Sequence, residues 1–475
     1  MSSIVMIIAH LLFVWLLGYY LILNLQWYNY KFKRILLHHH NPWLHILLFI
    51  FPLFVYFAFP NWVWLIAIFY GAVLYVWLRK IDKKLIFTAR VKRFFAFLLF
   101  FALFFDLLCL IKFSCRLYPT ILPLALASIV SFLIEKMLFQ AYKKEAKNRL
   151  SSIDPTIVAV TASYGKTSIK NFIYQLLKPD HKVYKTPRSV NTLAGIMKDI
   201  NESLPDDTQI YIVEAGARER GDIAEIAHFL DHHYAVIGKI GPQHIEYFKT
   251  IENITLTKLE LLQSKRLKKA FLWDGITIKD REIFVKYGKN IENIQESLDG
   301  IEFDLRLEDG IYHFFAPILG GFNALNISAA ILVAKEFGVD MKTIQERVRR
   351  LEPIEHRLQK IETPNKLIID DSFNGNLEGM LASYDLVKGY QGRKVVVTPG
   401  IVESDEESNV KLAQKINEVF DLAIITGKIN KDLLDRHIQI EKVVLEDKTK
   451  LQEILAQKTK DGDLILFSND APGYL

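Results

Sequence analysis

Residues 156–177 (TIVAVTASYGKTSIKNFIYQLL) constrain the fold of this chain more than any other segment. A β-branched run at 157–160 ends in a turn of small residues, and an amphipathic helical pattern follows. A strand, a glycine-containing loop, a lysine, a hydroxyl group and a helix together form an arrangement that binds nucleotide phosphates. The segment therefore predicts an α/β domain in which Lys166 reaches the terminal phosphates and Thr167 ligates Mg²⁺. Because the generic pattern has glycine where this chain has Val160, an ordinary strand-to-helix turn is the alternative interpretation.

The first third of the chain is much more apolar than the remainder. Since about 20 apolar residues are needed to cross a bilayer, we expect five membrane-spanning helices, or four if the hairpin around Pro60 is re-entrant. The runs that predict them are residues 4–25, 43–59, 62–78, 94–111 and 118–134. Asp106 lies inside the fourth run, where an ionisable group is costly and often functional. The alternative is a position near the outer end of the run, in contact with water or a hydroxyl group.

Lysine and arginine are distributed unevenly around these runs. They are concentrated at residues 31–34 and 79–93, whereas the segment between the fourth and fifth runs has only Lys112 and Arg116. Since cytoplasmic loops carry the excess of basic residues, the sequence predicts a multi-pass protein of the bacterial inner membrane. Its N-terminus would lie outside and its catalytic domains in the cytosol. Residues 135–149 are also basic and predict either a helix along the lipid headgroups or a plain connecting helix.

The formal net charge of the chain is +6. Because the basic excess lies beside the apolar runs, it fits a membrane surface better than nucleic acid. We therefore expect the lipid bilayer, and no nucleic acid, among the partners; the oligomeric state is left open.

Polar residues follow two predicted strands of the central part. Glu214 directly follows one apolar strand, and His244 follows another at residues 234–240. Because the carboxyl ends of parallel strands border the ligand-binding crevice of an open α/β sheet, Glu214 is expected to ligate Mg²⁺ opposite Thr167. Capping of the next helix is the alternative for Glu214. On their own, His244 and Lys258 would pass for surface residues.

Residues 351–475 alternate short apolar strands with helical patterns such as 410–420. This alternation predicts a small doubly wound sheet in a domain of its own. The expected fold class is an α-helical membrane region followed by α/β domains. The expected domains are the membrane region at 1–150, an ATP-binding central domain at 151–350 and a C-terminal domain at 351–475.

Seven short segments, taken in order, resemble the Mur ligase family: TASYGKTS, VEAGA, GPQHIE, TKLELL, GGFNALNISAA, EHRLQ and DDSFNGN. Their combination is far more specific than any one of them, and the resemblance covers residues 151–475. Within the family, the first and last segments are most similar to those of enzymes that add D-alanyl-D-alanine to UDP-N-acetylmuramoyl tripeptide. The resemblance implies a P-loop central domain, a smaller Rossmann-like C-terminal domain, and ATP-dependent, ADP-forming synthesis of an amide bond through an acyl phosphate.

The resemblance also implies roles for individual residues. The residues implied to contact ATP are Ala162, Ser163, Tyr164, Gly165, Lys166, Thr167, Ser168, Asn323, Asn326, Arg357 and Asp371. The residues implied to hold two Mg²⁺ ions are Thr167, Glu214, His244 and Lys258, the last as a carbamate. The residues implied to face the substrate are Asn191, Asn374 and Asn376. The residues implied to take part in catalysis are Lys166, His244 and Lys258.

The chain departs from the family's pattern in three respects. Ala162 stands where the loop usually has glycine, and two C-terminal segments, TPGIVESDEES and SNDAPGYL, differ in a region that bears on the choice of acceptor. The soluble first domain, which grips the UDP moiety in the family, is missing, and apolar runs stand in its place. Either the membrane region and its loops capture the substrate, or the acid substrate is already attached to lipid.

The function that the resemblance implies is addition of D-alanyl-D-alanine to a UDP-linked muropeptide in peptidoglycan precursor synthesis, with ATP and Mg²⁺. A first alternative is a Mur-type ligase that acts on a lipid-linked or other carboxylate. A second alternative, from another class, is a membrane transporter or scaffold with a cytosolic regulatory NTPase unit. Lys258 argues against the second, because simple NTPase modules have no use for that lysine.

Overall fold

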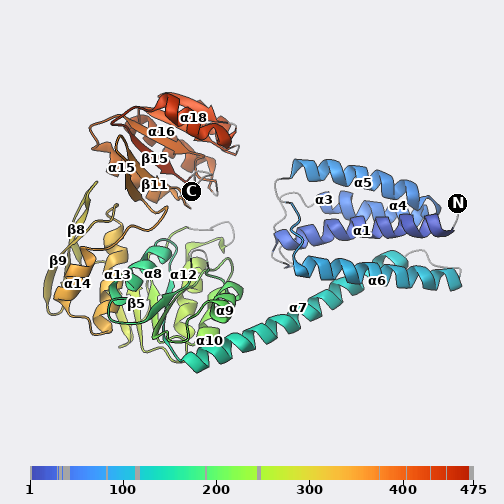
Figure 1. Ribbon diagram of the computed structural model, residues 1–475, viewed down its shortest axis with the longest axis horizontal. Coiled ribbons are helices and arrows are strands. Elements are labelled where there is room, and N and C mark those ends of the chain that lie inside the picture. Colours follow the sequence, from blue (N-terminus) through green and yellow to red (C-terminus); the bar gives the residue numbers. More distant parts are fainter. Residues whose placement is uncertain are drawn as a thin grey trace. The chain divides into compact units, whose positions relative to one another are not determined.

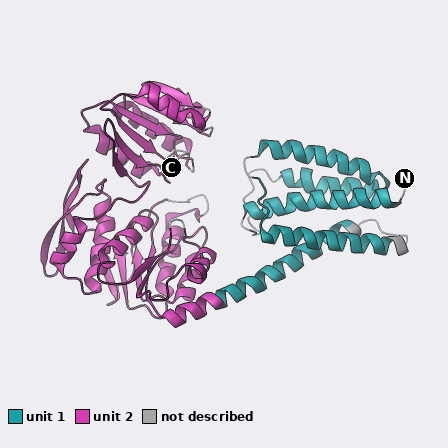
Figure 2. Cartoon of the chain, viewed as in Figure 1, with its two compact units in different colours: residues 1–144 teal, residues 145–475 magenta. Residues whose placement is uncertain are grey.

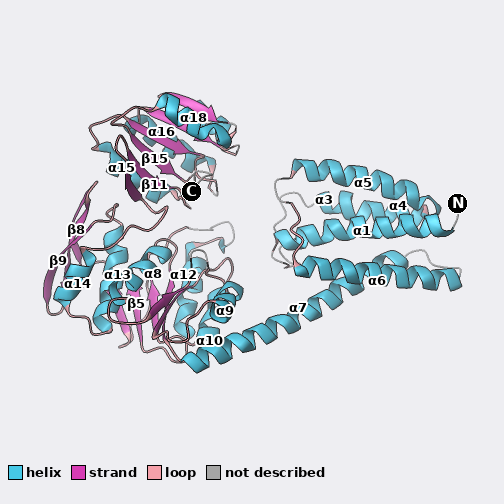
Figure 3. Cartoon of the chain, in the orientation of Figure 1, coloured by secondary structure: helices cyan, strands magenta, loops and turns pink. Residues whose placement is uncertain are grey.

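The computed structural model describes residues 3–28, 30, 35, 43–81, 84–112, 118–187, 190–242, 248–373, 375–402, 404–427, 429–445 and 447–469. The chain divides into two compact units, Met1–Lys144 and Glu145–Leu475 (Figure 2). The regular elements described in the first unit are helices, whereas the second unit combines helices with β-sheets (Figure 3).

Four long helices and one interrupted helix make up the described part of the first unit. The long helices are α1 (Ser3–Trp27), α5 (Val63–Lys80), α6 (Ala89–Lys112) and α7 (Tyr118–Ile153), the last of which continues into the second unit. The interrupted helix and the turn after it are α3 (Trp43–His45), the π-helical η1 (Ile46–Ile50), α4 (Phe51–Ala58) and the 3₁₀ turn η2 (Pro60–Trp62). α1 packs against both α5 and α6 (Figure 1). All five apolar runs are therefore helical, and α7 also includes residues 135–149.

Among the described residues of the first part of the chain, three helices are long and apolar enough to cross a membrane. They are Ile4–Trp27, Pro60–Lys80 and Thr120–Ile153, by length and composition. Residues Trp43–Ala58 form a shorter apolar helix.

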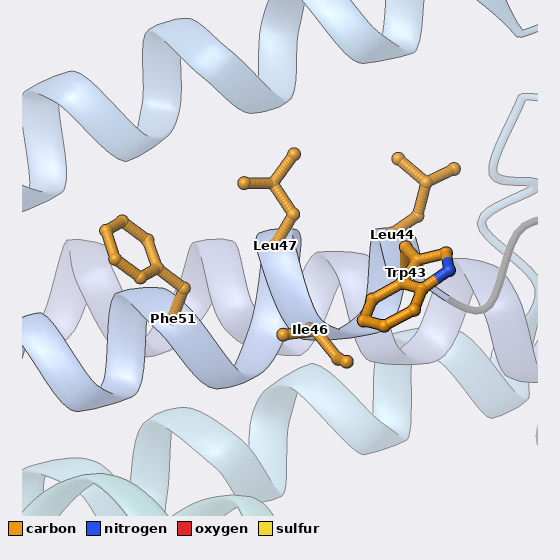
Figure 4. A pocket seen from close by; sticks show the side chains of 5 residues that line it. All are labelled: Trp43, Leu44, Ile46, Leu47 and Phe51. Carbon is orange, nitrogen blue, oxygen red and sulfur yellow. The ribbon is translucent and has the colours of Figure 1, made fainter.

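An open apolar groove lies along α3, η1 and the start of α4 (Figure 4). The residues that line it are Trp43, Leu44, Ile46, Leu47 and Phe51. None of them carries an acid, a base or a nucleophile, and Trp43, Leu47 and Phe51 are each more than half exposed. The groove is therefore an apolar surface and not a candidate active site.

A buried polar cluster inside the first unit includes Asp106. The His10 imidazole places Nδ1 2.8 Å from Asp106 Oδ1 and Nε2 3.0 Å from Thr120 Oγ1. All three residues are buried, and the ring of Tyr56 lies 5.5 Å from the His10 ring, centre to centre. The cluster thus joins α1, α4, α6 and α7. Asp106 is paired with an imidazole, a partner that was not predicted from the sequence.

The last turns of α7 belong to the second unit, where Arg149 fixes them to a neighbouring loop. Arg149 Nη2 donates to Leu204 O at 2.6 Å and to Asp206 Oδ1 at 2.9 Å. Asp154, whose φ is 46°, ends the helix directly before Pro155, in keeping with the bias of a residue before proline against helical conformation. The first strand of the second unit therefore starts at a helix end that is held by side-chain hydrogen bonds.

The second unit begins with a six-stranded parallel sheet in the order β2-β3-β1-β4-β5-β6. Its strands are β1 (Thr156–Thr161), β2 (Val183–Lys185), β3 (Ile210–Glu214), β4 (Tyr234–Ile237), β5 (Lys269–Trp273) and β6 (Phe284–Tyr287). Its helices are α8 (Lys166–Leu177), α9 (Leu193–Glu202), α10 (Asp222–Leu230), α12 (Ile251–Leu259) with the 3₁₀ turn η3 (Glu260–Gln263), α13 (Asn323–Glu336) and α14 (Met341–Val348). The strand predicted at 234–240 ends three residues earlier, at Ile237, because the chain then turns across the phosphate loop: Lys239 O accepts a hydrogen bond from Ser163 N.

A three-stranded antiparallel sheet, which was not predicted from the sequence, packs against α13. Its strands are β7 (Ile291–Ser297), β8 (Gly300–Leu307) and β9 (Gly310–Ala316). The buried side chains of Ile301, Phe303 and Leu305 alternate along β8 and join the core that contains α8 and α13. This sheet therefore extends the core of the central domain.

The C-terminal part contains a second six-stranded sheet, in the order β10-β11-β15-β12-β13-β14. Its strands are β10 (Gln359–Glu362), β11 (Leu367–Asp371), β12 (Lys394–Thr398), β13 (Leu422–Thr426), β14 (Glu441–Leu445) and β15 (Leu464–Ser468), all parallel except β10. The helices are α15 (Leu377–Lys388), α16 (Glu406–Val419), α17 (Lys431–His437) and α18 (Leu451–Lys458), with the 3₁₀ turn η4 (Lys448–Lys450). Val396 belongs to the core on one face and Val395 and Val397 to the core on the other. Both faces are covered, as expected for a doubly wound sheet.

Substitution of Asp106 by alanine should destabilise the first unit, because it leaves the buried Nδ1 of His10 without its acceptor, at a cost of about 1–3 kcal/mol. Six of the seven tryptophans precede residue 145, so thermal unfolding in detergent, followed by tryptophan fluorescence, reports on this unit. Leu107→Ala is the matched control, since Leu107 is 58% exposed on the same helix. Equal unfolding midpoints for the two variants would contradict a stabilising role of the cluster.

Candidate functional site

The turn between β1 and α8 has the backbone of a phosphate loop. Gly165 has a φ of +81°, which favours glycine. A Cβ atom at this position would lie 2.2 Å from Asn326 Oδ1, so only glycine fits beside α13. Ser163 N and Tyr164 N both donate to Lys239 O, at 2.9 and 3.3 Å, which anchors the loop to the segment after β4.

Three features of this loop fit an anion. The first backbone N–H groups of α8 have no intrahelical acceptors, and the buried Oγ of Ser163 has no hydrogen-bond partner among the described residues. Lys166 Nζ lies over the loop and donates to Ala162 O at 2.7 Å and to Ser163 O at 3.2 Å. Burial lowers the pKa of Lys166 to about 8, against the opposing effect of the Glu214 carboxylate. The loop can therefore receive the phosphates of a nucleotide.

The carboxylate of Glu214 lies at the carboxyl end of β3 and meets three side chains. Its Oε2 accepts from Thr167 Oγ1 at 3.1 Å and lies 3.1 Å from Lys170 Nζ, and its Oε1 accepts from Asn191 Nδ2 at 3.3 Å. Burial raises the pKa of Glu214, but the charges of Lys170 and Lys166 outweigh burial and hold this pKa below its ordinary value. A hydroxyl oxygen and an ionised carboxylate at hydrogen-bond distance form a donor set that suits Mg²⁺.

Lys258 is the third predicted charged residue of the site. It lies near the end of α12 and is 3% exposed. Burial, aided by the charge of Lys166, lowers its pKa well below the ordinary value, while Glu214 and Glu260 oppose the shift. The mutual electrostatic influence of Lys166, Glu214 and Lys258 places them in one site.

Two of the predicted residues, His244 and Asn374, lie outside the described residues, and their roles stay predictions. Asn376 is described, and its Oδ1 accepts from Gly379 N at 3.0 Å, which caps α15. The substrate contact predicted for Asn376 is untested.

The asparagines implied to contact the adenine end of ATP lie beside the phosphate loop. Asn326 Nδ2 donates to Asn323 Oδ1 at 2.9 Å, and Asn323 Nδ2 donates to Leu319 O at 2.8 Å. Both residues are buried, and Asn326 also borders Gly165. The contact with adenine stays a prediction, but the position next to the loop is as expected.

Arg357 approaches the same site from the segment that leads to the C-terminal sheet. Its Nη1 donates to Phe373 O at 2.9 Å and its guanidinium lies 4.7 Å from the centre of the Phe373 ring. Its charge contributes to the low pKa of Lys166. Asp371 Oδ1 accepts from Leu358 N at 3.2 Å, so the predicted ribose residue holds the main chain next to Arg357.

Two features of the site were not predicted from the sequence. Lys170 contacts Glu214 directly. The sequence pattern that could have indicated this contact is a lysine four residues after Lys166 and next to the apolar Ile169, which is an inward position of α8. An ion pair between Lys239 and Glu378 links the loop after β4 to α15. No local sequence pattern marks this second pair.

Comparison with known proteins agrees with this geometry. Residues 160–334 match the Mur ligase middle domain. The central domain of the chain is therefore a Mur ligase middle domain. Members of the Mur ligase family are ADP-forming, ATP-dependent amide ligases.

Two curated relatives illustrate how far the sequence similarity of this chain extends. It is 27% identical to the UDP-N-acetylmuramoyl-tripeptide–D-alanyl-D-alanine ligase of Bacillus subtilis over 350 residues, which are 69% of this chain and 76% of the relative. It is 24% identical to the ligase of the same name from Escherichia coli over 270 residues, 53% of this chain and 59% of the relative. The chain thus spans about three-fifths to three-quarters of the length of these relatives.

The fold is also similar to that of solved Mur ligases. The structure of MurF ligase from Thermotoga maritima in complex with ADP aligns with a TM-score of 0.60 and 24% identity, over 70% of this chain and 80% of that chain. The structure of UDP-N-acetylmuramoylalanyl-D-glutamyl-2,6-diaminopimelate–D-alanyl-D-alanyl ligase from Acinetobacter baumannii aligns with a TM-score of 0.62 and 21% identity, over 70% of this chain and 76% of that chain. The predicted α/β fold with parallel sheets is confirmed.

The pKa of Asp371 generates a prediction about stability. Burial raises this pKa from 3.8 to about 6, although Arg357 lowers it. The folded protein therefore keeps the proton that the unfolded chain releases, and Asp371 destabilises the fold as pH rises from about 4 to 6, by up to about 3 kcal/mol.

Denaturant unfolding of the full-length protein in detergent, at several pH values, checks this effect. Asp371→Asn should gain stability relative to the wild type across this pH interval, whereas the exposed Asp461→Asn in the same domain should follow the wild type. A difference between Asp371→Asn and the wild type that does not change with pH would contradict the prediction.

Proposed function

We propose that this Mur ligase adds D-alanyl-D-alanine to the free carboxyl group of UDP-N-acetylmuramoyl tripeptide, an ATP-dependent step of peptidoglycan precursor synthesis. The observation that carries the proposal is the meeting of Lys166, Thr167 and Glu214 at the carboxyl ends of β1 and β3, with Lys258 in electrostatic contact. The names of the Bacillus subtilis and Escherichia coli relatives supply the reaction.

The chemistry follows from the weakness of a carboxylate as an electrophile. A carboxylate oxygen attacks the γ-phosphorus of ATP, the bond to ADP breaks, and an acyl phosphate forms. The amine of D-alanyl-D-alanine then attacks the acyl carbon, phosphate leaves, and one of the two amine protons passes to solvent while the other stays on the new amide nitrogen. Lys166 and Arg357 offset negative charge at the transferring phosphoryl group, and the loop amides orient it. Mg²⁺ held by Thr167 and Glu214 would polarise the phosphate oxygens when bound.

Lys258 is proposed to become a carbamate. Its neutral amine, favoured by burial, adds to carbon dioxide, and one proton is released as the anion forms. A carbamate supplies two oxygen atoms and a negative charge, which an amine cannot, and could therefore hold a second Mg²⁺ together with His244. The buried position of Lys258 at 3% exposure limits loss of the carbamate to water.

The first unit is proposed to anchor the enzyme in the bacterial inner membrane. The length and apolar composition of Ile4–Trp27, Pro60–Lys80 and Thr120–Ile153 support this location. The basic residues at 31–34 and 79–93 support an orientation with residues 151–475 in the cytosol. In this proposal the membrane region precedes the catalytic residues 151–475, the UDP-linked tripeptide is the substrate, and a lipid-linked acid is the alternative.

The substrate dependence of phosphate release tests the proposed reaction. Detergent-solubilised full-length protein, with ATP and Mg²⁺, should release phosphate only when UDP-linked tripeptide and D-alanyl-D-alanine are both present. Phosphate release that occurs with a lipid-linked acid, but not with the UDP-linked tripeptide, would favour the first alternative. Release without any acceptor amine would favour the NTPase alternative.

The same assay should show loss of activity for Lys258→Ala, with partial recovery on addition of formate or acetate as substitute carboxylates. Lys265→Ala is the matched control, because Lys265 is an exposed lysine just beyond η3. Full activity of Lys258→Ala would contradict the role of the carbamate.

Protease accessibility tests the proposed membrane orientation. In spheroplasts, the second unit should resist trypsin added from outside, whereas in sealed inside-out vesicles it should be degraded. Release of the intact protein from the membranes into solution by alkaline carbonate would contradict a membrane-spanning anchor.

A further inference from the structure

Lys170 is a buried lysine that the reaction described above does not use. It lies on the inward face of α8, directly after the buried Ile169 and one turn beyond Lys166, and it is 1% exposed. Lysine is almost never fully buried unless its charge is paired. The conformation of α8 brings Lys166 and Lys170 to one face, since residues four apart are neighbours on a helix.

The charge of Lys170 is paired with the carboxylate proposed to bind Mg²⁺. Lys170 Nζ lies 3.1 Å from Glu214 Oε2, the same oxygen that accepts from Thr167. The other oxygen, Oε1, accepts from Asn191 at 3.3 Å. Both oxygens of the carboxylate are therefore engaged by groups of this chain alone.

Lys170 also reaches the loop that carries Asn191. Its Nζ donates to Pro187 O at 3.4 Å, in the segment between β2 and α9. Asn191 O in turn accepts from Gly216 N at 2.7 Å, directly beyond Glu214. The lysine thus links the carboxylate to the loop that is implied to face the substrate.

The charges around Glu214 determine how favourably a divalent cation can bind there without a nucleotide. The ammonium groups of Lys166 and Lys170 both act on the single carboxylate of Glu214. Arg357, whose charge acts on Lys166, adds a third positive charge. Even with a carbamate at Lys258, these three cations would outnumber the two anions. A divalent ion therefore gains little from this site by itself, whereas nucleotide phosphates bring several negative charges and reverse the balance.

We propose that Lys170 is a resident cation: its ammonium group occupies the position beside Glu214 when no ligand is bound, and so makes divalent-metal binding depend on the nucleotide. Lys170 is a positioning residue in this scheme, because its ion pair with Glu214 Oε2 holds the carboxylate beside Thr167 until metal and nucleotide arrive together. The inference rests on the proposed function in one respect, that the site takes a nucleotide with Mg²⁺.

Binding of Mn²⁺ to the full-length protein in detergent, measured from the electron paramagnetic resonance signal of free Mn²⁺, tests this inference without reference to activity. Wild-type protein should bind Mn²⁺ weakly alone and much more tightly with ADP. Lys170→Met and Lys170→Gln should bind Mn²⁺ about tenfold or more tightly than wild type without nucleotide, because the competing charge is gone. The increase in Mn²⁺ affinity on addition of ADP should therefore be smaller in these two variants than in the wild type.

Three further variants serve as controls. Lys178→Met removes an exposed lysine at the end of the same helix and should match the wild type. Lys170→Met/Glu214→Gln removes both charges of the pair, should fold because no lone charge stays buried, and should lose the nucleotide-free Mn²⁺ site. Glu214→Gln alone should bind Mn²⁺ weakly even with ADP.

Equal Mn²⁺ affinity of wild type, Lys170→Met and Lys170→Gln in the absence of nucleotide would overturn the inference. Since this readout needs neither acid nor amine substrate, it is independent of the substrate assay. A failure of the proposed ligase reaction and a failure of the resident-cation role are therefore distinguishable.

Discussion

A single buried carboxylate organises the central domain. Glu214 is 3% exposed at the end of β3, and an ionised group in such a place needs both charge and hydrogen bonds around it. α8 supplies Thr167 and Lys170, and the loop after β2 supplies Asn191. The parallel order of β2, β3 and β1 is what brings these three contributions to one edge of the sheet.

Burial and positive charge act together around this carboxylate. Burial lowers the pKa values of both Lys166 and Lys258, because desolvation disfavours an ammonium ion. The site therefore contains amines that are readily neutralised, beside one carboxylate that stays ionised. Such a site is matched to ligands that bring negative charge with them, and poorly matched to a cation that arrives alone.

Most of the correct predictions from the sequence came from patterns of residues that are close together in the chain. The strand, glycine turn and helix at residues 156–177 were confirmed because each depends on neighbouring residues, and Glu214 was placed by the end of its strand. The partner of Glu214 was missed, since a lysine within a helix is usually solvated and its burial depends on packing from distant segments. The antiparallel sheet β7–β9 was missed as well, because much of β7 is exposed and has no clear apolar alternation. The role of Asp371 in holding Leu358 depends on the antiparallel pairing of β10 with β11, whose register the sequence did not reveal.

The backbone around Arg357 has a mechanical consequence. His356 and Leu358, one on each side, have φ angles of 58° and 51°, a conformation that costs an L-residue about 1–2 kcal/mol. The hydrogen bonds from Leu358 N to Asp371 and from His356 Nδ1 to Asp370 keep both residues there. Arg357 is therefore tied to the edge of the C-terminal sheet by the residues on both sides of it, so that its guanidinium keeps a fixed place relative to β11.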